Sequence, residues 1–278
     1  MNTSQDEKMN TSQPKIPCSV EILTRNSEAT LERCLQSLKD FAEIIVLDGN
    51  SIDRTLQIAS RFGCRIVKQY ESDEPEIKIG NFSEVRNKGL RRARYDWFMY
   101  VDSDEYLSPE LADEIRVIVA DPSPEARVWW QPRKYVYEGK VIDCAVTYPN
   151  RQIRFFHKSA VKEFIKSVHE RIEVRPGEKI GALKHFEYVP LDSFAALRSR
   201  WVRYLLLEQE ILREHPLTAR RFLRFFWRQI KIVGLYAYRY LRILFFCRGT
   251  RLPARYEFGR IEYHLRLAGI VARAFLWR

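Results

Sequence analysis

Two carboxylates separated by one residue follow a short apolar segment near the middle of the chain. Residues 97–101 (WFMYV) have the pattern of a buried strand, and Asp102 and Asp104 come directly after it. Carboxylates at a strand end can converge on a hard cation such as Mg²⁺ or Mn²⁺, which keeps open positions for phosphate oxygens. The alternative is an acidic loop that caps the next helix. The pair therefore predicts a metal site only together with other features.

A second acidic group ends the apolar run at residues 43–47 (EIIVL), where Asp48 follows directly. Ligands of parallel sheets bind at the carboxyl ends of the strands, so Asp48 and Asp102 are expected at the same sheet edge. A carboxylate there can accept hydrogen bonds from a base or from ribose hydroxyls. The alternative, an Asx turn and helix cap, explains Asp53 fully and Asp48 only in part.

The elements that must position these residues alternate between strand and helix. Strands are expected at 19–23, 43–47, 65–68 and 97–101, with helices at 28–39, from Ser51 to Phe62, from Ser83 to Ala93, and after Ser108-Pro109. This alternation predicts an α/β fold, a mostly parallel sheet with helices on both faces. Hairpin strands are expected at 128–137, 141–148 and 152–156, with a turn at 138–139. After residue 191 the pattern is helical, with breaks at 215–216 and 249–253.

Five segments in this order resemble the family 2 glycosyltransferases of the GT-A fold. They are residues 19–26 (SVEILTRN), 43–48 (EIIVLD), 86–90 (RNKGL), 102–105 (DSDE) and 168–170 (VHE). The last resembles the branch that contains lipopolysaccharide-core glucosyltransferases. The resemblance covers about residues 16–190 and departs from the commoner family pattern at Gly49-Asn50. It implies a Rossmann-like GT-A domain. It also implies a hexosyltransferase that takes a sugar from a nucleotide-diphosphate sugar and inverts the configuration at its anomeric carbon.

The resemblance also implies how the donor is bound. Asp48 would bind the base or ribose, with Thr24 and Asn26 lining the same pocket and Arg86 beside the nucleotide. Asp102 would contact ribose or the metal.

A divalent ion, Mg²⁺ or Mn²⁺, would offset the charge that develops on the leaving nucleoside diphosphate. Asp104 would ligate it together with Asp102, and His185 resembles the histidine that this fold supplies to the metal. His169 is expected to be a positioning residue.

An inverting reaction needs a base for the acceptor hydroxyl, and Glu170 is the predicted one. The alternatives are a surface ion pair of Glu170 with a neighbouring Arg or Lys, and Glu105 as the base. Arg151 and Arg154 alternate on one predicted strand, where a solvated face is favoured over contact with the diphosphate.

Positive charge is concentrated in the last third of the chain. The net charge is +11, but residues 198–278 hold 18 basic and 5 acidic residues, whereas residues 1–197 hold 29 and 31. This asymmetry points to nucleic acid or an anionic membrane surface as the partner.

Residues 219–247 contain no acidic residue and have the period of an amphipathic helix. Basic side chains share one sector: Arg220, Arg221, Arg224, Arg228, Lys231, Arg239 and Arg242. The opposite side is aromatic and aliphatic: Phe222, Phe225, Phe226, Val233, Tyr236, Tyr240, Ile243 and Leu244. A spanning helix is excluded, because each central charge would cost about 2.5–3.5 kcal/mol. The pattern predicts a helix lying on an anionic membrane; the alternative is that its apolar face packs on the catalytic domain or a second subunit. No nucleic-acid partner is expected, because the apolar face is too wide.

Together these features predict a disordered tail (1–15), a GT-A domain (16–197) and a helical basic membrane-associating region (198–278). The hydrophobic fraction of 46% rules out a wholly disordered chain. The tail has no apolar segment and cannot be a signal peptide. The five cysteines are scattered, which fits a reducing compartment and argues against a zinc ribbon or a disulfide scaffold. We therefore expect a peripheral enzyme on the cytoplasmic face of the inner membrane, with a lipid-linked glycan or lipopolysaccharide-core acceptor.

Two other classes of function compete with this one. The chain could transfer sugar onto polyprenyl phosphate, or it could be a non-catalytic protein that binds membrane or nucleic acid. A dinucleotide oxidoreductase is disfavoured, because no G-x-G-x-x-G follows the first strand.

Overall fold

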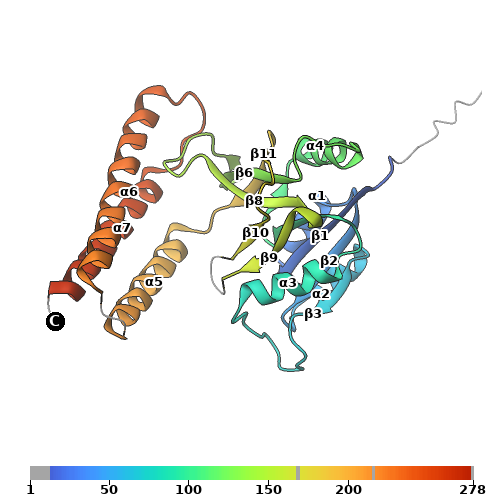
Figure 1. The fold of residues 1–278 in the computed structure, drawn as a ribbon, viewed down its shortest axis with the longest axis horizontal. Coiled ribbons are helices and arrows are strands. Elements are labelled where there is room, and N and C mark those ends of the chain that lie inside the picture. The colour runs from blue at the N-terminus through green and yellow to red at the C-terminus, as the bar shows by residue number, and fades with distance from the viewer. Residues whose placement is uncertain (1–12, 167–169, 215–216, 277–278) are drawn as a thin grey trace, which may run out of the picture. The chain divides into compact units, whose positions relative to one another are not determined.

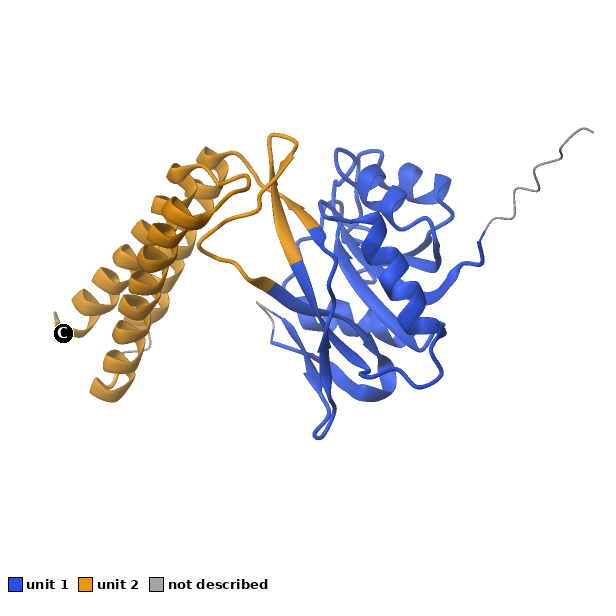
Figure 2. Cartoon of the chain, turned by 90° about the horizontal axis from the view of Figure 1, so that it is seen from above, with its two compact units in different colours: residues 1–132, 151–187 blue, residues 133–150, 188–278 orange. Residues whose placement is uncertain are grey.

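The computed structural model describes residues 13–166, 170–214 and 217–276, and Figure 1 shows its helices and strands. The chain divides into two compact units, drawn in Figure 2. Unit 1 comprises residues 1–132 and 151–187, and unit 2 comprises residues 133–150 and 188–278. Unit 2 thus includes a loop from the middle of the chain in addition to the C-terminal region.

A parallel sheet forms the centre of unit 1. Its four parallel strands are β1 (Ile16–Thr24), β2 (Phe41–Asp48), β3 (Arg65–Lys68) and β4 (Trp97–Asp102). They lie in the order β3-β2-β1-β4, and the register pairs Thr24 with Asp48 and Leu23 with Asp102. The carboxyl ends of three neighbouring strands therefore carry the predicted donor-binding residues at one edge.

Helices cover both faces of this sheet (Figure 1). One face packs against α1 (Leu31–Ser37), α2 (Thr55–Arg61) and α4 (Pro109–Ala120). The other face packs against α3 (Phe82–Arg92) and a hairpin of β9 (Val161–Ile165) and β10 (Arg171–Val174). β1 supplies apolar side chains to both faces, and so it is almost wholly buried. The prediction of an α/β fold with helices on both faces of a mostly parallel sheet is confirmed.

Shorter or mixed strands extend the sheet beyond β4. They are β5 (Tyr106–Leu107), β6 (Val128–Tyr137), β7 (Lys140–Val141), β8 (Asn150–His157), β11 (Ile180–Ala182) and β12 (Glu187–Pro190), with a 3₁₀ turn at Lys158–Ala160. The order continues β4-β8-β6-β12-β5, and β8 runs antiparallel to β4. The turn at Glu138-Gly139 is confirmed, with positive φ at both residues.

The prediction of a strand at 141–148 is wrong beyond Val141. The backbone of this segment bonds inside unit 2 instead of to a neighbouring strand. The N–H groups of Asp143 and Cys144 donate to the Thr250 carbonyl (2.8 and 3.1 Å), and that of Val146 donates to Glu257 (3.0 Å). Its donors are satisfied by tertiary contacts that the local pattern does not encode.

Helix α2 begins later than the sequence predicts. Ser51 does not cap it: its hydroxyl oxygen accepts from the Asn26 N–H (2.8 Å), and its N–H and hydroxyl donate to Asp48 (2.7 and 2.6 Å). The Asp53 carboxylate instead accepts from the N–H of Thr55, the first helical residue (2.9 Å). Asp53 therefore forms the predicted Asx turn, but the N-cap position is Arg54, which makes no side-chain capping bond.

The starts of α3 and α4 differ in how well they were predicted. Asn81, not Ser83, caps α3 by accepting from the Glu84 N–H (3.4 Å). The Ser108 hydroxyl accepts from the Leu111 N–H at the start of α4 (3.2 Å), as the Ser-Pro pattern predicts.

Unit 2 is mainly helical. Its helices are α5 (Phe194–Glu214), α6 (Ala219–Phe246) and α7 (Ala254–Leu276). Thr218 caps α6 as predicted, accepting from the Arg221 N–H (3.4 Å). Among the described residues, no helix is long and apolar enough to cross a bilayer.

A disulfide joins Cys144 to Cys247 within unit 2, 103 residues apart in sequence. The scattered cysteines argue against disulfides, and this expectation is corrected for Cys144 and Cys247. A pairing between residues so far apart leaves no local sequence motif. Cys18, Cys34 and Cys64 are free.

Removing this disulfide should loosen unit 2. The closed loop is long, so Cys144→Ser/Cys247→Ser should lower the free energy of unfolding by about 2–4 kcal/mol. The measurement is thermal unfolding with and without reductant, with Cys64→Ser as the control. An unfolding midpoint that ignores both reductant and the double substitution would contradict the prediction.

Candidate active site

The nucleotide-binding residues predicted on β1 and β2 come together at the carboxyl edge of the sheet. Asp48 is 3% exposed and accepts from the Thr24 hydroxyl (2.8 Å) as well as from Ser51. Asp48 thus makes the turn that the structural alternative proposed, and the same contacts fix its carboxylate beside Thr24.

The loop after Asp48 accounts for the departure at Gly49-Asn50. A Cβ at Gly49 would lie 2.8 Å from the Ile77 carbonyl oxygen, so a larger residue would displace the loop between β3 and α3. Asn50 has a positive φ, which Asn tolerates, and its amide donates to the Ser72 and Glu74 carbonyls (both 2.7 Å).

Asn26 lies at the same edge. Its side-chain oxygen accepts from the Ile52 N–H (2.9 Å), and its amide donates to Glu76. The structure therefore brings Thr24, Asn26 and Asp48 to one edge.

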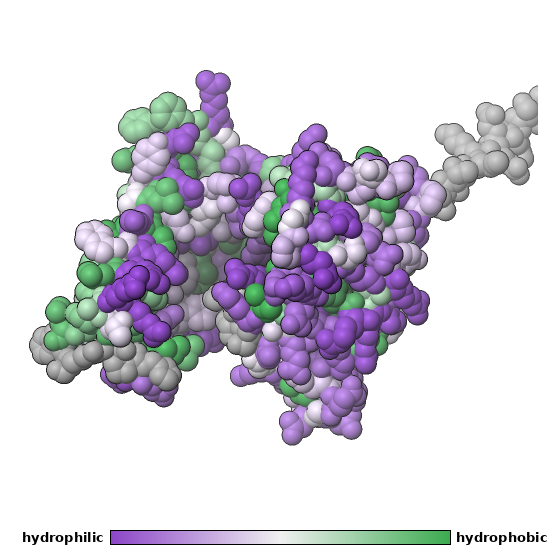
Figure 3. Space-filling view, viewed as in Figure 1, coloured by the Kyte–Doolittle hydropathy of each residue, from purple (hydrophilic) through white to green (hydrophobic). Residues whose placement is uncertain are grey.

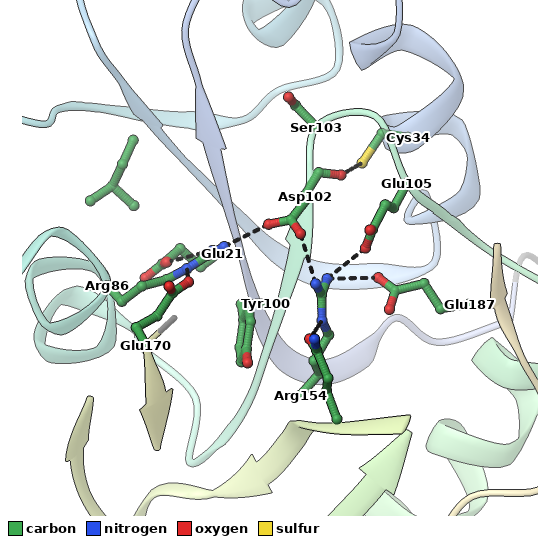
Figure 4. Close-up of polar contacts among 12 residues, drawn as sticks. Glu21, Cys34, Arg86, Tyr100, Asp102, Ser103, Glu105, Arg154, Glu170 and Glu187 are labelled. Atoms are coloured by element: carbon green, nitrogen blue, oxygen red, sulfur yellow. Dashed lines mark hydrogen bonds and ion pairs between the residues drawn. The ribbon is translucent and has the colours of Figure 1, made fainter. Parts of the chain in front are cut away.

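Asp102 lies between two buried arginines (Figure 4). One carboxylate oxygen accepts from Arg86 Nη2 and the other from Arg154 Nη2, each at 2.7 Å. The Asp102 side chain is 39% exposed, whereas those of Arg86 and Arg154 are 2% and 4% exposed. Charge-assisted hydrogen bonds to both oxygens fix the carboxylate in one orientation.

The RNKGL segment explains how Arg86 is positioned. Arg86 also donates to Glu21 (3.0 Å) and stacks over the Tyr100 ring, 4.5 Å from its centroid. Asn87 pairs through both ends of its amide with the backbone of Phe164 (2.9 and 2.8 Å), which ties α3 to β9. Gly89 leaves room for Glu21, whose carboxylate oxygen would lie 1.8 Å from a Cβ there.

Glu21 is a fully buried carboxyl within β1. Burial raises its pKa to about 7, against the lowering effect of Arg86. A raised folded-state pKa means that the folded protein holds a proton which the unfolded chain releases near pH 4.5.

The resulting pH dependence is testable. The free energy of unfolding should fall as pH rises from about 4.5 to 7, by roughly 3 kcal/mol for this group. Glu21→Gln should remove that part of the slope in urea unfolding at pH 5 and pH 8. Equal slopes for the two proteins would refute the assignment.

Arg154 is the centre of a second cluster, and the prediction that it lies on a solvated face is wrong. It donates to Asp102, to Glu105 (2.7 Å) and to Glu187 (3.1 Å), and its guanidinium lies 5.0 Å from the Tyr100 ring centroid. Arg154 is buried because β8 pairs with β4 inside the sheet.

Arg151, on the same strand, is exposed as expected. The two residues are three apart on a strand, so their side chains point to opposite faces of the sheet. The sequence does not say which of the two faces is covered.

The predicted metal ligands do not form a three-ligand site. Across the described segments, no group of three His, Cys, Asp or Glu side chains is placed to hold a metal ion. Both oxygens of Asp102 already accept from guanidinium groups, and the backbone N–H of His185 donates to Glu114 of α4 (3.0 Å). Asp102, Asp104 and His185 therefore stay a prediction as metal ligands.

Of the two possible bases, Glu170 has the more accessible carboxylate. Glu105 is 4% exposed and paired with Arg154, so it cannot reach an acceptor. Glu170 is 17% exposed, and its carboxylate oxygen lies 3.6 Å from Arg86 Nε (Figure 4). The expected surface pair with a neighbouring cation is thus replaced by a contact with a buried arginine. His169 lies outside the described residues.

Five carboxylates surround the two buried arginines: Glu21, Asp102, Glu105, Glu170 and Glu187. Sequence reasoning missed Glu21, Arg154 and Glu187. Only Glu21 left a signal, as a charged residue inside an otherwise apolar strand.

Residues 19–123 match the family model described as glycosyl transferase family 2. This part of the chain is therefore a domain of that enzyme family, as the sequence motifs predict.

Three relatives illustrate the range of similarity. A glycosyltransferase of Rickettsia bellii is 35% identical over 114 residues, covering 41% of this chain and 36% of the relative. The prophage-derived glycosyltransferase SunS of Bacillus subtilis is 28% identical, covering 79% and 50%. The lipopolysaccharide core biosynthesis glycosyltransferase LpsC of Rhizobium meliloti is 26% identical, covering 64% and 66%. The chain spans half or less of the length of the first relatives that it matches.

Among solved structures, residues 1–349 of TarS from S. aureus in complex with UDP have a TM-score of 0.47 and 19% identity to this chain. The match covers 83% of this chain and 72% of the TarS chain.

Proposed function

We propose that this chain is an inverting glycosyltransferase that moves a sugar from a nucleotide-diphosphate sugar to a hydroxyl of a lipid-linked glycan or lipopolysaccharide-core acceptor. The observation that carries the proposal is the Arg86 guanidinium, which contacts both Asp102 and Glu170. A donor-side carboxylate and a candidate base thus share one buried cation. The family 2 domain supports the reaction class, and the similarity to LpsC supports the acceptor class.

The proposed chemistry uses these residues in sequence. Thr24, Asn26 and Asp48 bind the base and ribose of the donor, and Asp102 binds the ribose. The acceptor oxygen attacks the anomeric carbon, and the bond from that carbon to the diphosphate oxygen breaks. The electron pair leaves with the nucleoside diphosphate, and Glu170 takes the hydroxyl proton.

The experiment is a screen of nucleotide sugars for hydrolysis and nucleotide binding, with and without Mg²⁺ or Mn²⁺. One donor should be turned over, and Asp102→Asn should lower its hydrolysis by about 10²-fold, because the carboxylate then loses its charge-assisted bonds to both arginines. Asp96→Asn, an exposed residue just before the same strand, is the matched control. No turnover of any donor, or full activity in Asp102→Asn, would refute the proposal. The metal requirement, predicted from the sequence, is decided by the same screen with a chelator.

We further propose that the enzyme works as a peripheral protein on the cytoplasmic face of the inner membrane. The concentrated positive charge of residues 198–278 supports a membrane surface. The Cys144–Cys247 disulfide counts against this compartment, because cytoplasmic thiols stay reduced. Alkylation of thiols at the moment of cell lysis tests the location: both cysteines should react if the proposal is right.

A further inference from the structure

The aromatic side of α6 that the sequence predicts as membrane-facing packs inside unit 2. Phe222 stacks on Phe275 of α7 with ring centroids 4.2 Å apart, and Tyr240 contacts Phe258 at 4.9 Å. Gln229, in the middle of α6, is buried and hydrogen-bonded to His264 (2.8 Å). This face packs against α5 and α7 of the same unit, which is neither of the two partners, the catalytic domain or a second subunit, that the sequence left open.

A different strip of large apolar side chains on α6 is exposed. Its members recur at helical spacing and are Leu223 (52% exposed), Trp227 (55%), Tyr238 (58%), Leu241 (55%) and Phe245 (77%). We call these five residues the exposed strip. Hydrophobic and hydrophilic atoms alternate over the helices of unit 2 (Figure 3). A row of large exposed apolar side chains on one side of a helix marks a binding surface.

Basic side chains border the exposed strip along one edge. Arg220, Arg224, Lys231 and Arg242 are all exposed, and on a helix of 3.6 residues per turn they lie within about 100° of the strip. No acidic residue occurs anywhere in α6. An apolar row beside a purely basic row is complementary to acyl chains beneath anionic headgroups.

We infer that the exposed strip and its basic edge bind an anionic lipid bilayer, with α6 lying along the surface. The inference rests on the proposed membrane location. It goes further by assigning the contact to α6 and by placing it on the exposed strip instead of on the aromatic side predicted from the sequence. Trp227 and Tyr238 would lie at the headgroup level, where amphipathic rings are favoured. Leu223, Leu241 and Phe245 would enter the acyl boundary. α6 is 28 residues long, which gives a contact about 42 Å in length.

The test is flotation of the full chain with vesicles of phosphatidylcholine alone or mixed with phosphatidylglycerol. Binding should require the anionic lipid and weaken with salt. Trp227→Ser/Phe245→Ser should reduce binding by about tenfold or more, because two large rings no longer enter the bilayer. The matched control is Val117→Ser/Leu206→Ser, which removes two equally exposed apolar side chains from α4 and α5.

Hydrolysis of the soluble donor should be unchanged in both double variants, so failure of membrane binding and failure of the proposed enzyme activity are separate results. Loss of lipid binding only in the strip variant supports the inference. Equal binding by the strip variant and wild type overturns it. The inference also fails if light scattering without lipid shows a dimer that only the strip variant disrupts, because a second copy would then cover the strip.

Discussion

Arg154→Leu should abolish most activity and destabilise unit 1. The substitution leaves Asp102, Glu105 and Glu187 facing one another without the guanidinium that donates to all three. Uncompensated buried charge of this kind costs about 3–5 kcal/mol. The Asp102 carboxylate would also be held by Arg86 on one side instead of by two arginines, and misplacement by about 1 Å can lower turnover about 10²-fold.

Arg154→Lys separates the two effects, because it keeps the charge and loses the fork that reaches three carboxylates. We expect a protein that folds, with kcat reduced more than nucleotide affinity, since Thr24 and Asp48 are untouched. Arg151→Leu, on the exposed side of the same strand, is the control and should leave both unchanged. Full activity in a folded Arg154→Lys variant would show that Arg154 has no positioning role.

The parallel sheet could be predicted because its strands are continuous apolar runs that end in chemistry-bearing residues. The register of these strands then brings the predicted donor-binding residues together: Thr24 and Asp48 are neighbours, and Leu23 pairs with Asp102. Helix starts were predicted only where the capping residue adjoins its helix, as at Ser108. Ser51 failed as a cap because its hydroxyl oxygen accepts from the Asn26 N–H of a neighbouring strand end, four residues before the helix begins.

The arginine clusters could not be predicted, because burial depends on which strands pair. Arg151 and Arg154 lie on opposite faces of one strand, but the sequence does not say which face is covered, and the pairing of β8 with β4 buries Arg154. The same limit applies to α6. Its hydrophobic period identifies an amphipathic helix, but α7 covers the side with the most aromatic residues. Hydrophobic periodicity identifies the apolar sides of a helix, and tertiary contacts decide which of these sides remains exposed.

Glu170→Gln should lower turnover by about 10²–10⁴-fold while nucleotide binding is retained, because the amide cannot take the acceptor proton. The neighbouring Arg86 keeps its bonds to Glu21 and Asp102, so the donor side of the site should stay intact. The measurements are single-turnover transfer to the acceptor and titration with the nucleotide. Glu173→Gln is the matched control, since it changes the same charge in a half-exposed pair with Lys162.

The same variant separates the two acceptor classes. A hydroxyl acceptor must lose a proton as it attacks, whereas the oxygen of a polyprenyl phosphate is already anionic and needs no strong base. Activity that survives Glu170→Gln would therefore favour the phosphate acceptor and remove Glu170 from the reaction. Loss of turnover with unchanged nucleotide affinity would favour the hydroxyl acceptor, and Arg86 would then be the residue that holds the base and the donor-side carboxylate at a fixed separation.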